Sequence, residues 1–408
     1  MTTALATTTA VFTGIGVTAP NGLGTEAWWR ATLAGESGIR PVSRFDASGY
    51  PARLAGEVPG FDPAEHIPSR LLPATDHMTR LALTAAKEAV ADSGASPGEL
   101  PPYSAGVVTA ASAGGFEYGQ RELQALWSKG GQYVSAYQSY AWFYAVNTGQ
   151  ISIRHGLRGP SGVLVTEQAG GLDAVAQARR QLRKGSKLIV SGGVDGAICP
   201  WGWTAQLAGG RMSTVTDPGR AYLPFDAEAS GYVVGEGGAI LVLEDAEAAR
   251  DRGARVYGRL AGYAATFDPA PGRGGEPGLR RAAELALEEA SLAPSAVDVV
   301  FADAAGVPEL DRQETDALTA LFGARGVPVT APKTMTGRLL AGGASLDLAA
   351  ALLSVRDAVI PPTVNVTAPA DGALDLVTAV RRGPVRTALV LARGRGGFNA
   401  AAVVTADD

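Results

Sequence analysis

The stretch VTEQAGGLDA, residues 165–174, has the pattern of a turn that presents a reactive side chain. The apolar run at residues 161–165 predicts a short buried strand before it, and the amphipathic run at 169–184 predicts a helix that ends at Gly185. A side chain at such a turn points out beside the free amide groups and the positive end of the helix, which stabilise a thiolate or an oxyanion. The residue at the turn is Gln168, whose amide cannot act as a nucleophile.

Other residue types that could carry chemistry are few and scattered. The histidines His66, His77 and His155 have no metal-ligand spacing, so structural or surface roles are favoured for all of them and no metal site is expected. Cys199, in AICPWGW, is expected to be a buried small hydrophobic residue rather than a nucleophile. The GxSxG pattern of a hydrolase elbow does not occur.

Two glycine-rich segments suggest a dinucleotide or anion site. GYVVGEGGA, residues 231–239, runs from one expected strand into another and not from a strand into a helix, so tight backbone packing is the favoured interpretation. RGRGGFNA, residues 393–400, is a glycine turn between two expected strands. Its two arginines are either solvated or paired with an anion.

Short apolar strands alternate with amphipathic helices along the chain, which predicts an α/β fold with mostly parallel sheets covered by helices. Strands are expected at residues 10–17, 105–110, 187–193, 238–244, 256–264, 297–302, 327–331, 387–391 and 399–405. Helices are expected at residues 75–93, 277–290, 309–322 and 340–355. The two series predict two similar halves, residues 1–250 and 251–408.

Composition narrows the class of protein. The chain has 408 residues, 46% of them hydrophobic, and can therefore bury a substantial core. Its net charge of −5, without a basic tract, argues against nucleic-acid binding. The single cysteine excludes an internal disulfide and fits a reducing compartment. With no signal-peptide pattern and no long apolar run, we expect a cytoplasmic protein without membrane contact.

Several segments resemble beta-ketoacyl synthases of the thiolase fold: VTEQAGGLDA, YLPFDAEASGYVVGEGGAILVLED and APKTMTGRLLAGGASLDLAA. The similarity covers nearly the whole chain in the same order. FEYGQRELQALW, AWFYAVNTGQISIRHGLRGPS and VTEQAGG are most similar to the chain-length factor, the non-condensing ketosynthase beta subunit of bacterial type II aromatic polyketide synthases. The resemblance implies a five-layered αβαβα fold built from two pseudo-equivalent halves.

The resemblance also implies which catalytic positions are altered. Condensing members carry a cysteine and two histidines where this chain has Gln168, Asp303 and Arg338, whereas the family's lysine is retained as Lys333. Claisen condensation needs a nucleophile and donors for an enolate and an oxyanion. Asp303 would place an anion where a donor is needed, and Arg338 is expected to pair with it and fill the pocket. No catalytic set is intact, so the chain is not expected to condense by itself.

Three functions remain open at this point. The resemblance favours a heterodimer with a catalytic ketosynthase alpha subunit, in which this chain shapes the tunnel for the growing poly-beta-ketone. That chain would be carried on the phosphopantetheine arm of acyl carrier protein, with no cofactor of this chain's own. An alternative is a malonyl-carrier-protein decarboxylase in which Gln168 and Lys333 stabilise the enolate, and another is a standalone protein that binds acyl chains or the carrier protein. Whether the chain has an enzymatic activity of its own stays open.

The resemblance implies side-by-side pairing through the strand before the turn, across a large apolar interface. The run YVSAYQSYAWF, residues 133–143, is too apolar for an exposed loop and is the candidate contact rim. The expected interface residues are Gly162, Val163, Leu164, Val165, Tyr137, Tyr140, Trp142 and Phe143.

Phe116, Gly119 and Leu123 are spaced three and four apart, so they share one face of a helix expected near residues 115–129. In the resembling family this helix faces the polyketide tunnel, although such a stripe is also compatible with ordinary core. Gly119 costs about 1 kcal/mol of helix stability relative to alanine, which suggests that space is needed there. Because only Phe116 is bulky, we expect a long tunnel and a decaketide-range product.

Overall fold

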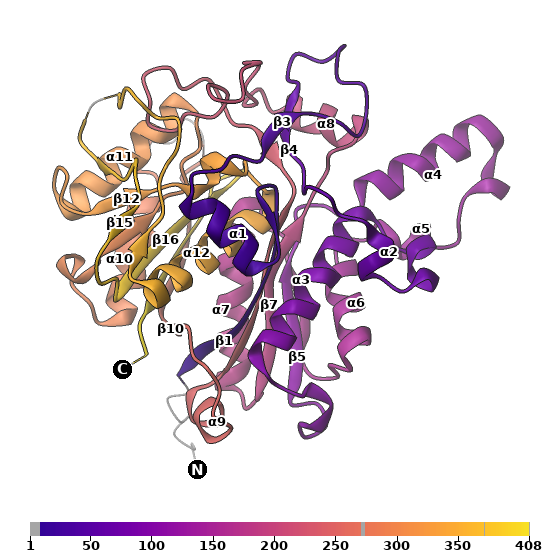
Figure 1. Cartoon of the computed structure of the whole chain (residues 1–408), viewed down its shortest axis with the longest axis horizontal. Helices are drawn as coiled ribbons and strands as arrows, with labels where there is room; N and C mark the ends of the chain where they lie inside the picture. The colour runs from indigo at the N-terminus through magenta and orange to yellow at the C-terminus, as the bar shows by residue number, and fades with distance from the viewer. Residues whose placement is uncertain (1–8, 271–273, 371, 408) are drawn as a thin grey trace.

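The computed structural model describes residues 9–270, 274–370 and 372–407. Within these ranges a mixed sheet of 12 strands has the order β14-β12-β11-β16-β17-β10-β1-β9-β7-β5-β6, with β2 beside β1 (Figure 1). The strands of its first half are β1 (Ala10–Ala19), β2 (Gly22–Leu23), β5 (Ala105–Ala110), β6 (Ser161–Leu164), β7 (Leu188–Asp195) and β9 (Gly237–Asp245). Those of its second half are β10 (Gly258–Phe267), β11 (Val299–Phe301), β12 (Pro328–Thr330), β14 (Asp375–Leu376), β16 (Thr387–Gly394) and β17 (Phe398–Thr405).

The two halves of the sheet repeat one pattern of strand directions. In the first half, β1 and β9 are antiparallel, β9 and β7 are antiparallel, and β7, β5 and β6 are parallel. In the second half, β10, β17, β16, β11 and β12 follow the same pattern in the same order. The halves join where Val11 pairs with Arg259 and Phe12 with Gly258. The predicted construction from two pseudo-equivalent halves is confirmed.

Helices form three layers around the two half-sheets (Figure 1). Helices α7 (Gly170–Arg183) and α12 (Gly343–Asp357) lie between the halves, and every residue from Gly343 to Ser354 is buried. Such all-round burial is typical of a central helix. The outer helices are α3 (His77–Ser93) and α6 (Val146–His155) on the first half, with α10 (Leu279–Ala290) and α11 (Pro308–Phe322) on the second. The αβαβα thiolase architecture expected from the sequence is therefore present.

The remaining elements form surface lobes and connections. A small sheet of β3 (Ile39–Pro41), β4 (Leu54–Gly56) and β8 (Val234–Gly235) lies beside α8 (Pro200–Leu207). An arm made of α4 (Phe116–Lys129), η3 (Gly131–Tyr133) and α5 (Gln138–Ala141) projects away from the body (Figure 1). The other short elements are α1 (Thr25–Leu33), α2 (Pro63–His66), α9 (Ala246–Asp251), β13 (Val359–Ile360), β15 (Arg381–Arg382), η1 (Ser69–Ala74), η2 (Pro97–Glu99), η4 (Glu167–Ala169), η5 (Pro294–Ala296), η6 (Pro332–Met335) and η7 (Leu340–Gly342).

Local details show how the helix predicted at residues 75–93 begins and ends, and they correct the prediction of one strand. Asp76 caps α3 by accepting the amide of Met78 at 2.9 Å, and Gly94 ends that helix in the left-handed conformation. The prediction of a buried strand at residues 161–165 is wrong, because β6 lies at the sheet edge with its residues partly exposed, and Val165 is 46% exposed. Over the described residues, we find no helix with the length and apolar character that a membrane crossing requires.

Candidate functional site

Gln168 lies where the sequence places it, at the turn η4 between β6 and α7. Its side chain is fully buried, and within the described residues neither its Oε1 nor its Nε2 atom has a hydrogen-bond partner. It packs against the start of α12, where a Cβ atom added to Gly343 would lie only 2.5 Å from the Nε2 atom. The prediction that this side chain points outward is therefore wrong. The residue before it, Glu167, has a positive φ of 52°, so its backbone is in the left-handed region and the turn is strained.

Asp303 and Arg338 form the buried ion pair that the sequence predicts. Asp303 follows β11, and its Oδ1 atom accepts a hydrogen bond from Nη2 of Arg338 at 3.0 Å. Arg338, between η6 and η7, also donates from Nη1 to the carbonyl of Asp303 at 2.9 Å. Burial by itself would raise the pKa of Asp303, but Arg338 and Arg393 hold it well below its usual range. The carboxylate stays charged, so this position cannot donate a proton to a developing oxyanion.

Arg393 at the end of β16 completes the cluster from the opposite side. Its Nε donates to Oδ2 of Asp303 at 3.0 Å, and its Nη2 donates to Oε2 of Glu314 on α11, also at 3.0 Å. Glu314 in turn accepts the backbone amides of Asp303 and Ala304 at 2.8 and 2.9 Å. Burial raises the pKa of Glu314, and Arg393 opposes that shift. Of the two alternatives left open for the arginines of RGRGGFNA, Arg393 therefore meets an anion.

Lys333 is retained but is fully engaged in structural contacts. Its Nζ atom donates to the carbonyl of Ala302 at 2.8 Å and lies 2.6 Å from Oδ2 of Asp347 on α12. Both side chains of this ion pair are buried. Lys333, Arg338 and Arg393 thus face three buried carboxylates, which leaves little free positive charge for an enolate.

A hollow opens beside this cluster. Asp303, Arg338 and Arg393 lie at its buried end, and more exposed residues surround its opening. The latter include Glu167, Gln206, Arg211, Tyr232, Asp268 and Arg395. Gln168 does not line this hollow. The side chains that do line it include neither a thiol nor a histidine, so the hollow holds no cysteine nucleophile and no histidine for condensation.

The other candidate residues lie outside this site. Cys199 is buried, and burial raises the pKa of its thiol to about 11. His77 lies 3.3 Å from the fully buried carboxylate of Glu236, a contact that the sequence did not indicate. The described part of the chain has no group of histidine, cysteine and carboxylate side chains arranged to hold a metal ion.

Phe116, Gly119 and Leu123 lie on α4 as expected, but the space beside Gly119 is already filled. A Cβ atom at Gly119 would lie 2.9 Å from Cδ1 of Trp142 and 3.1 Å from Cζ3 of Trp201. Phe116 also packs on Trp201, with ring centroids 4.8 Å apart. Leu123 is 37% exposed and lines a shallow apolar hollow together with Trp201. The glycine therefore lets two tryptophans approach α4, and open space remains only beside Leu123.

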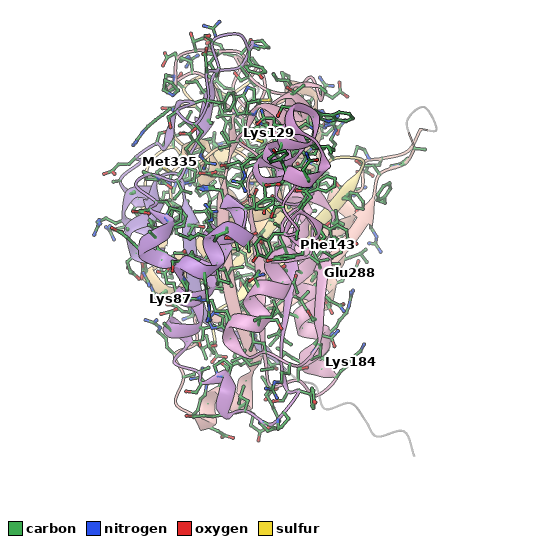
Figure 2. All side chains as sticks on the ribbon, turned by 90° about the vertical axis from the view of Figure 1, so that its right-hand side faces the viewer. Lys87, Lys129, Phe143, Lys184, Glu288 and Met335 are labelled. Atoms are coloured by element: carbon green, nitrogen blue, oxygen red, sulfur yellow. The ribbon has the colours of Figure 1, made fainter. Side chains whose placement is uncertain are left out.

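The expected interface residues include several large apolar side chains that are exposed at the surface, among them Phe143, which is labelled in Figure 2. The exposed fractions are 44% for Tyr137, 36% for Tyr140, 44% for Trp142 and 47% for Phe143. An apolar groove beside this run is lined by α6 and by Gly162 and Val163 of β6. The run at residues 133–143 is thus exposed in the single chain, which is unusual for so many large apolar side chains.

Comparisons with known proteins agree over almost the whole chain. Residues 8–249 match the family model for the beta-ketoacyl synthase N-terminal domain, and residues 257–367 match that for the C-terminal domain. A tetracenomycin polyketide synthase ketoacyl synthase beta subunit from Streptomyces glaucescens is 62% identical over 398 residues, 97% of each chain. An actinorhodin polyketide putative beta-ketoacyl synthase 2 from Streptomyces coelicolor is 60% identical, covering 97% of this chain and 98% of the relative.

Solved structures of ketosynthases are also similar to this chain over almost its whole length. A structure described as the ishigamide ketosynthase/chain length factor has a TM-score of 0.88 and 27% identity, over 98% of this chain and 100% of its own. A second is a type II acyl carrier protein in complex with its ketosynthase bound to the hexaketide. The matched chain has a TM-score of 0.87 and 26% identity, with 98% and 100% coverage.

Proposed function

The chain belongs to the beta-ketoacyl synthase family, and we propose that it is the non-condensing chain-length factor of a type II polyketide synthase. In this role it pairs with a catalytic ketosynthase alpha subunit and shapes the tunnel that sets the length of the polyketide. The observation that carries the proposal is the buried cluster in which Asp303 pairs with Arg338 and Arg393. The resemblance assigns Asp303 and Arg338 to two catalytic positions of the family and the buried Gln168 to the third, so paired charges and an amide stand where condensation needs a nucleophile and donors.

The exposed apolar face supplies the surface for the partner. β6 ends the sheet and pairs only with β5 among the described strands, so its free edge can add a strand from another chain. Tyr140 and Phe143 flank the groove beside that edge. We assign Gly162, Val163, Leu164 and Val165, together with the exposed aromatic run, to the interface with the ketosynthase alpha subunit. A second copy of this chain would give a dimer without any cysteine nucleophile at its active sites.

The growing chain is carried, in this proposal, on the phosphopantetheine arm of acyl carrier protein in the cytoplasm. Of the three residues proposed on α4, Leu123 then faces the polyketide beside the open hollow, while Phe116 and Gly119 act through the tryptophans packed on them. A malonyl-carrier-protein decarboxylase is less well supported, because Gln168 is fully buried and does not line the hollow. Lys333 is also held by Asp347 and by a backbone carbonyl.

The test is co-expression with a ketosynthase alpha subunit that carries an intact catalytic cysteine, with malonyl-loaded carrier protein as substrate. We expect a stable complex of the two chains and a polyketide product that depends on both, measured by native mass spectrometry and product mass analysis. Purified chain alone should form no carbon–carbon bond. Chain extension by the purified protein, free of any ketosynthase from the expression host, would contradict the proposal.

A further inference from the structure

The first turn of α4 has no capping side chain of its own. Its N-cap residue is Gly115, and the amide of Tyr118 donates a hydrogen bond to Oδ2 of Asp76 at 2.7 Å. Asp76 belongs to a different helix, because it is the N-cap of α3, where its Oδ1 atom accepts the amide of Met78 at 2.9 Å. One carboxylate therefore accepts hydrogen bonds from the first turns of two helices: it is the N-cap of α3 and also binds an amide of α4.

The contact between the two helix starts is buried and tight. Asp76 is 3% exposed. A Cβ atom at Gly115 would lie 2.7 Å from Cβ of Asp76 and 2.4 Å from the carbonyl oxygen of Ala141. Hydrogen bonds to a charged acceptor are stronger than those between neutral groups, and more so away from water. The beginning of α4 is thus held in place by a short, buried, charge-assisted contact.

Farther along, α4 is held more loosely. The helix projects from the body (Figure 1), and Trp127 near its end is 83% exposed. Arg44 lies 3.5 Å from Glu117, but this pair is partly exposed and such contacts contribute little. Further bonds hold the first half of the helix: the Tyr118 hydroxyl donates to the carbonyl of Pro73 at 3.2 Å, and Oε1 of Gln120 accepts the amide of Trp201 at 2.7 Å. Glu122 bonds within the arm, where its Oε2 atom accepts the amide of Ser135 at 2.6 Å. A helix of this length spans about 20 Å, so a tilt of about 5° at its start moves its end by about 2 Å.

We propose that Asp76 is a positioning residue for chain length, because it fixes the start of α4 and with it the placement of Phe116, Gly119 and Leu123. The inference rests on the proposed function, in which α4 borders the polyketide tunnel. Asp76 does not touch the growing chain and acts only through the helix. Releasing the anchor leaves the ketosynthase partner catalytic but lets the tunnel wall move, so the length of the product becomes less well defined.

The variant Asp76→Ser separates the two bonds of this carboxylate. Serine is a good N-cap residue and keeps the cap of α3, but its shorter side chain cannot also reach the amide of Tyr118. The matched control is Asp245→Ser. Asp245 caps α9 by accepting the amides of Glu247 and Ala248 at 3.1 and 3.3 Å, within a single helix far along the chain from α4. Both variants are assembled with the ketosynthase alpha subunit and assayed as heterodimers.

For Asp76→Ser we expect the ratio of the main product to products of other lengths to fall by about tenfold or more, the change for losing one hydrogen bond to a charged acceptor. Total malonyl consumption should stay within about threefold of the wild type, because the partner's catalytic residues are untouched. Backbone amides of α4 should exchange with deuterium faster, and Asp245→Ser should change neither readout. A general loss of stability would lower the rate without changing the distribution of lengths.

An unchanged product distribution in an assembled Asp76→Ser heterodimer overturns the inference. If Asp76→Ser does not assemble, product distribution and deuterium exchange are measured on Asp76→Asn instead. Asparagine keeps one acceptor oxygen for the cap of α3, and an unchanged distribution in that heterodimer also overturns the inference. Leu123→Phe, at the residue of α4 that borders the open hollow, distinguishes this failure from that of the proposed function. If Leu123→Phe shifts the product length and Asp76→Ser does not, the anchoring role of Asp76 is refuted and the tunnel role of α4 stands. If neither variant shifts the length, the tunnel role of α4 is contradicted.

Discussion

Replacing Asp303 by asparagine should destabilise the chain strongly while preserving its shape. In the native cluster Lys333, Arg338 and Arg393 face three carboxylates, and Asp303 alone bonds to both arginines. Asparagine removes one negative charge, so that Glu314 and one amide oxygen remain to accept hydrogen bonds from the two buried guanidinium groups. Removing one partner of a buried ion pair costs about 3 to 5 kcal/mol. A typical free energy of unfolding is about 5 to 15 kcal/mol, so the loss is a large fraction of the total.

The assay is urea unfolding followed by circular dichroism, with the midpoint compared at an unchanged slope. The matched control is Glu288→Gln, which removes an acid from an exposed pair. Glu288 is labelled at the surface in Figure 2 and lies 3.3 Å from Arg281, with exposed side-chain fractions of 62% and 55%. Exposed pairs contribute about 0 to 1 kcal/mol, so this variant should be nearly neutral.

A second variant tests whether charge balance is the cause. Asp303→Asn combined with Arg338→Met removes one charge of each sign, and it should recover a substantial part of the lost stability. The reasoning is refuted if Asp303→Asn costs no more than Glu288→Gln. It is also refuted if the double variant is less stable than Asp303→Asn, because the arginine would then be stabilising without its partner.

Three further outcomes are expected. Gln168→Ala should lower the stability of the complex modestly and leave the product unchanged, because the side chain is buried away from the hollow. A loss of about 10²-fold in the rate of chain initiation, rescued by supplying a pre-acylated partner subunit, would contradict this expectation. Leu123→Phe should shorten the product of an active heterodimer, because Leu123 borders the open hollow beside α4. Mass analysis of the polyketide would measure the length, and an unchanged length would count against the role of this helix. Burial raises the pKa of Asp76 to about 6 and that of Asp311 to about 7, so the folded chain binds these protons more tightly than the unfolded chain. The free energy of unfolding in urea should therefore rise as the pH falls from about 7 to about 5, by up to about 1.4 kcal/mol per pH unit for each titrating group, and a decrease over this range would contradict the assignment.

Sequence patterns predicted the periodic elements well and the contacts between distant segments poorly. The strand at residues 105–110 was placed correctly, because an apolar run between turn residues is a local signal. The apolar pattern wrongly predicted that β6 is buried, because an apolar edge strand has the same composition as a buried one, whereas the resemblance had assigned this strand to a subunit interface. The crowding at Gly119 was also missed, since Trp142 and Trp201 come from separate elements that only the tertiary structure brings together.

The site follows the same division. Pairing of Asp303 with Arg338 could be expected, because opposite charges stand at two positions that are neighbours in the resembling family. The contacts of Arg393 and Glu314 with Asp303 could not be predicted. These residues lie 90 and 11 positions from Asp303 along the chain, and they meet it only because β16 and α11 pack beside β11. The one signal in the sequence was that Arg393 stands at the end of an expected strand, beside a glycine turn. That signal leaves open whether the anion is a ligand or part of the chain.

The altered positions depend on one another, which bears on whether catalysis could be restored by single substitutions. Gln168→Cys alone would bury a thiol at a fully enclosed turn, where burial raises its pKa and lowers its reactivity. Asp303→His alone would remove the carboxylate that balances Arg338 and Arg393, leaving the two guanidiniums beside a group that can itself become cationic. Arg338→His alone would leave the negative Asp303 next to the new histidine, so that it could not serve an oxyanion. The two substitutions to histidine are opposed by the charges that remain and the substitution to cysteine by burial, so the surroundings favour retention of the non-condensing state.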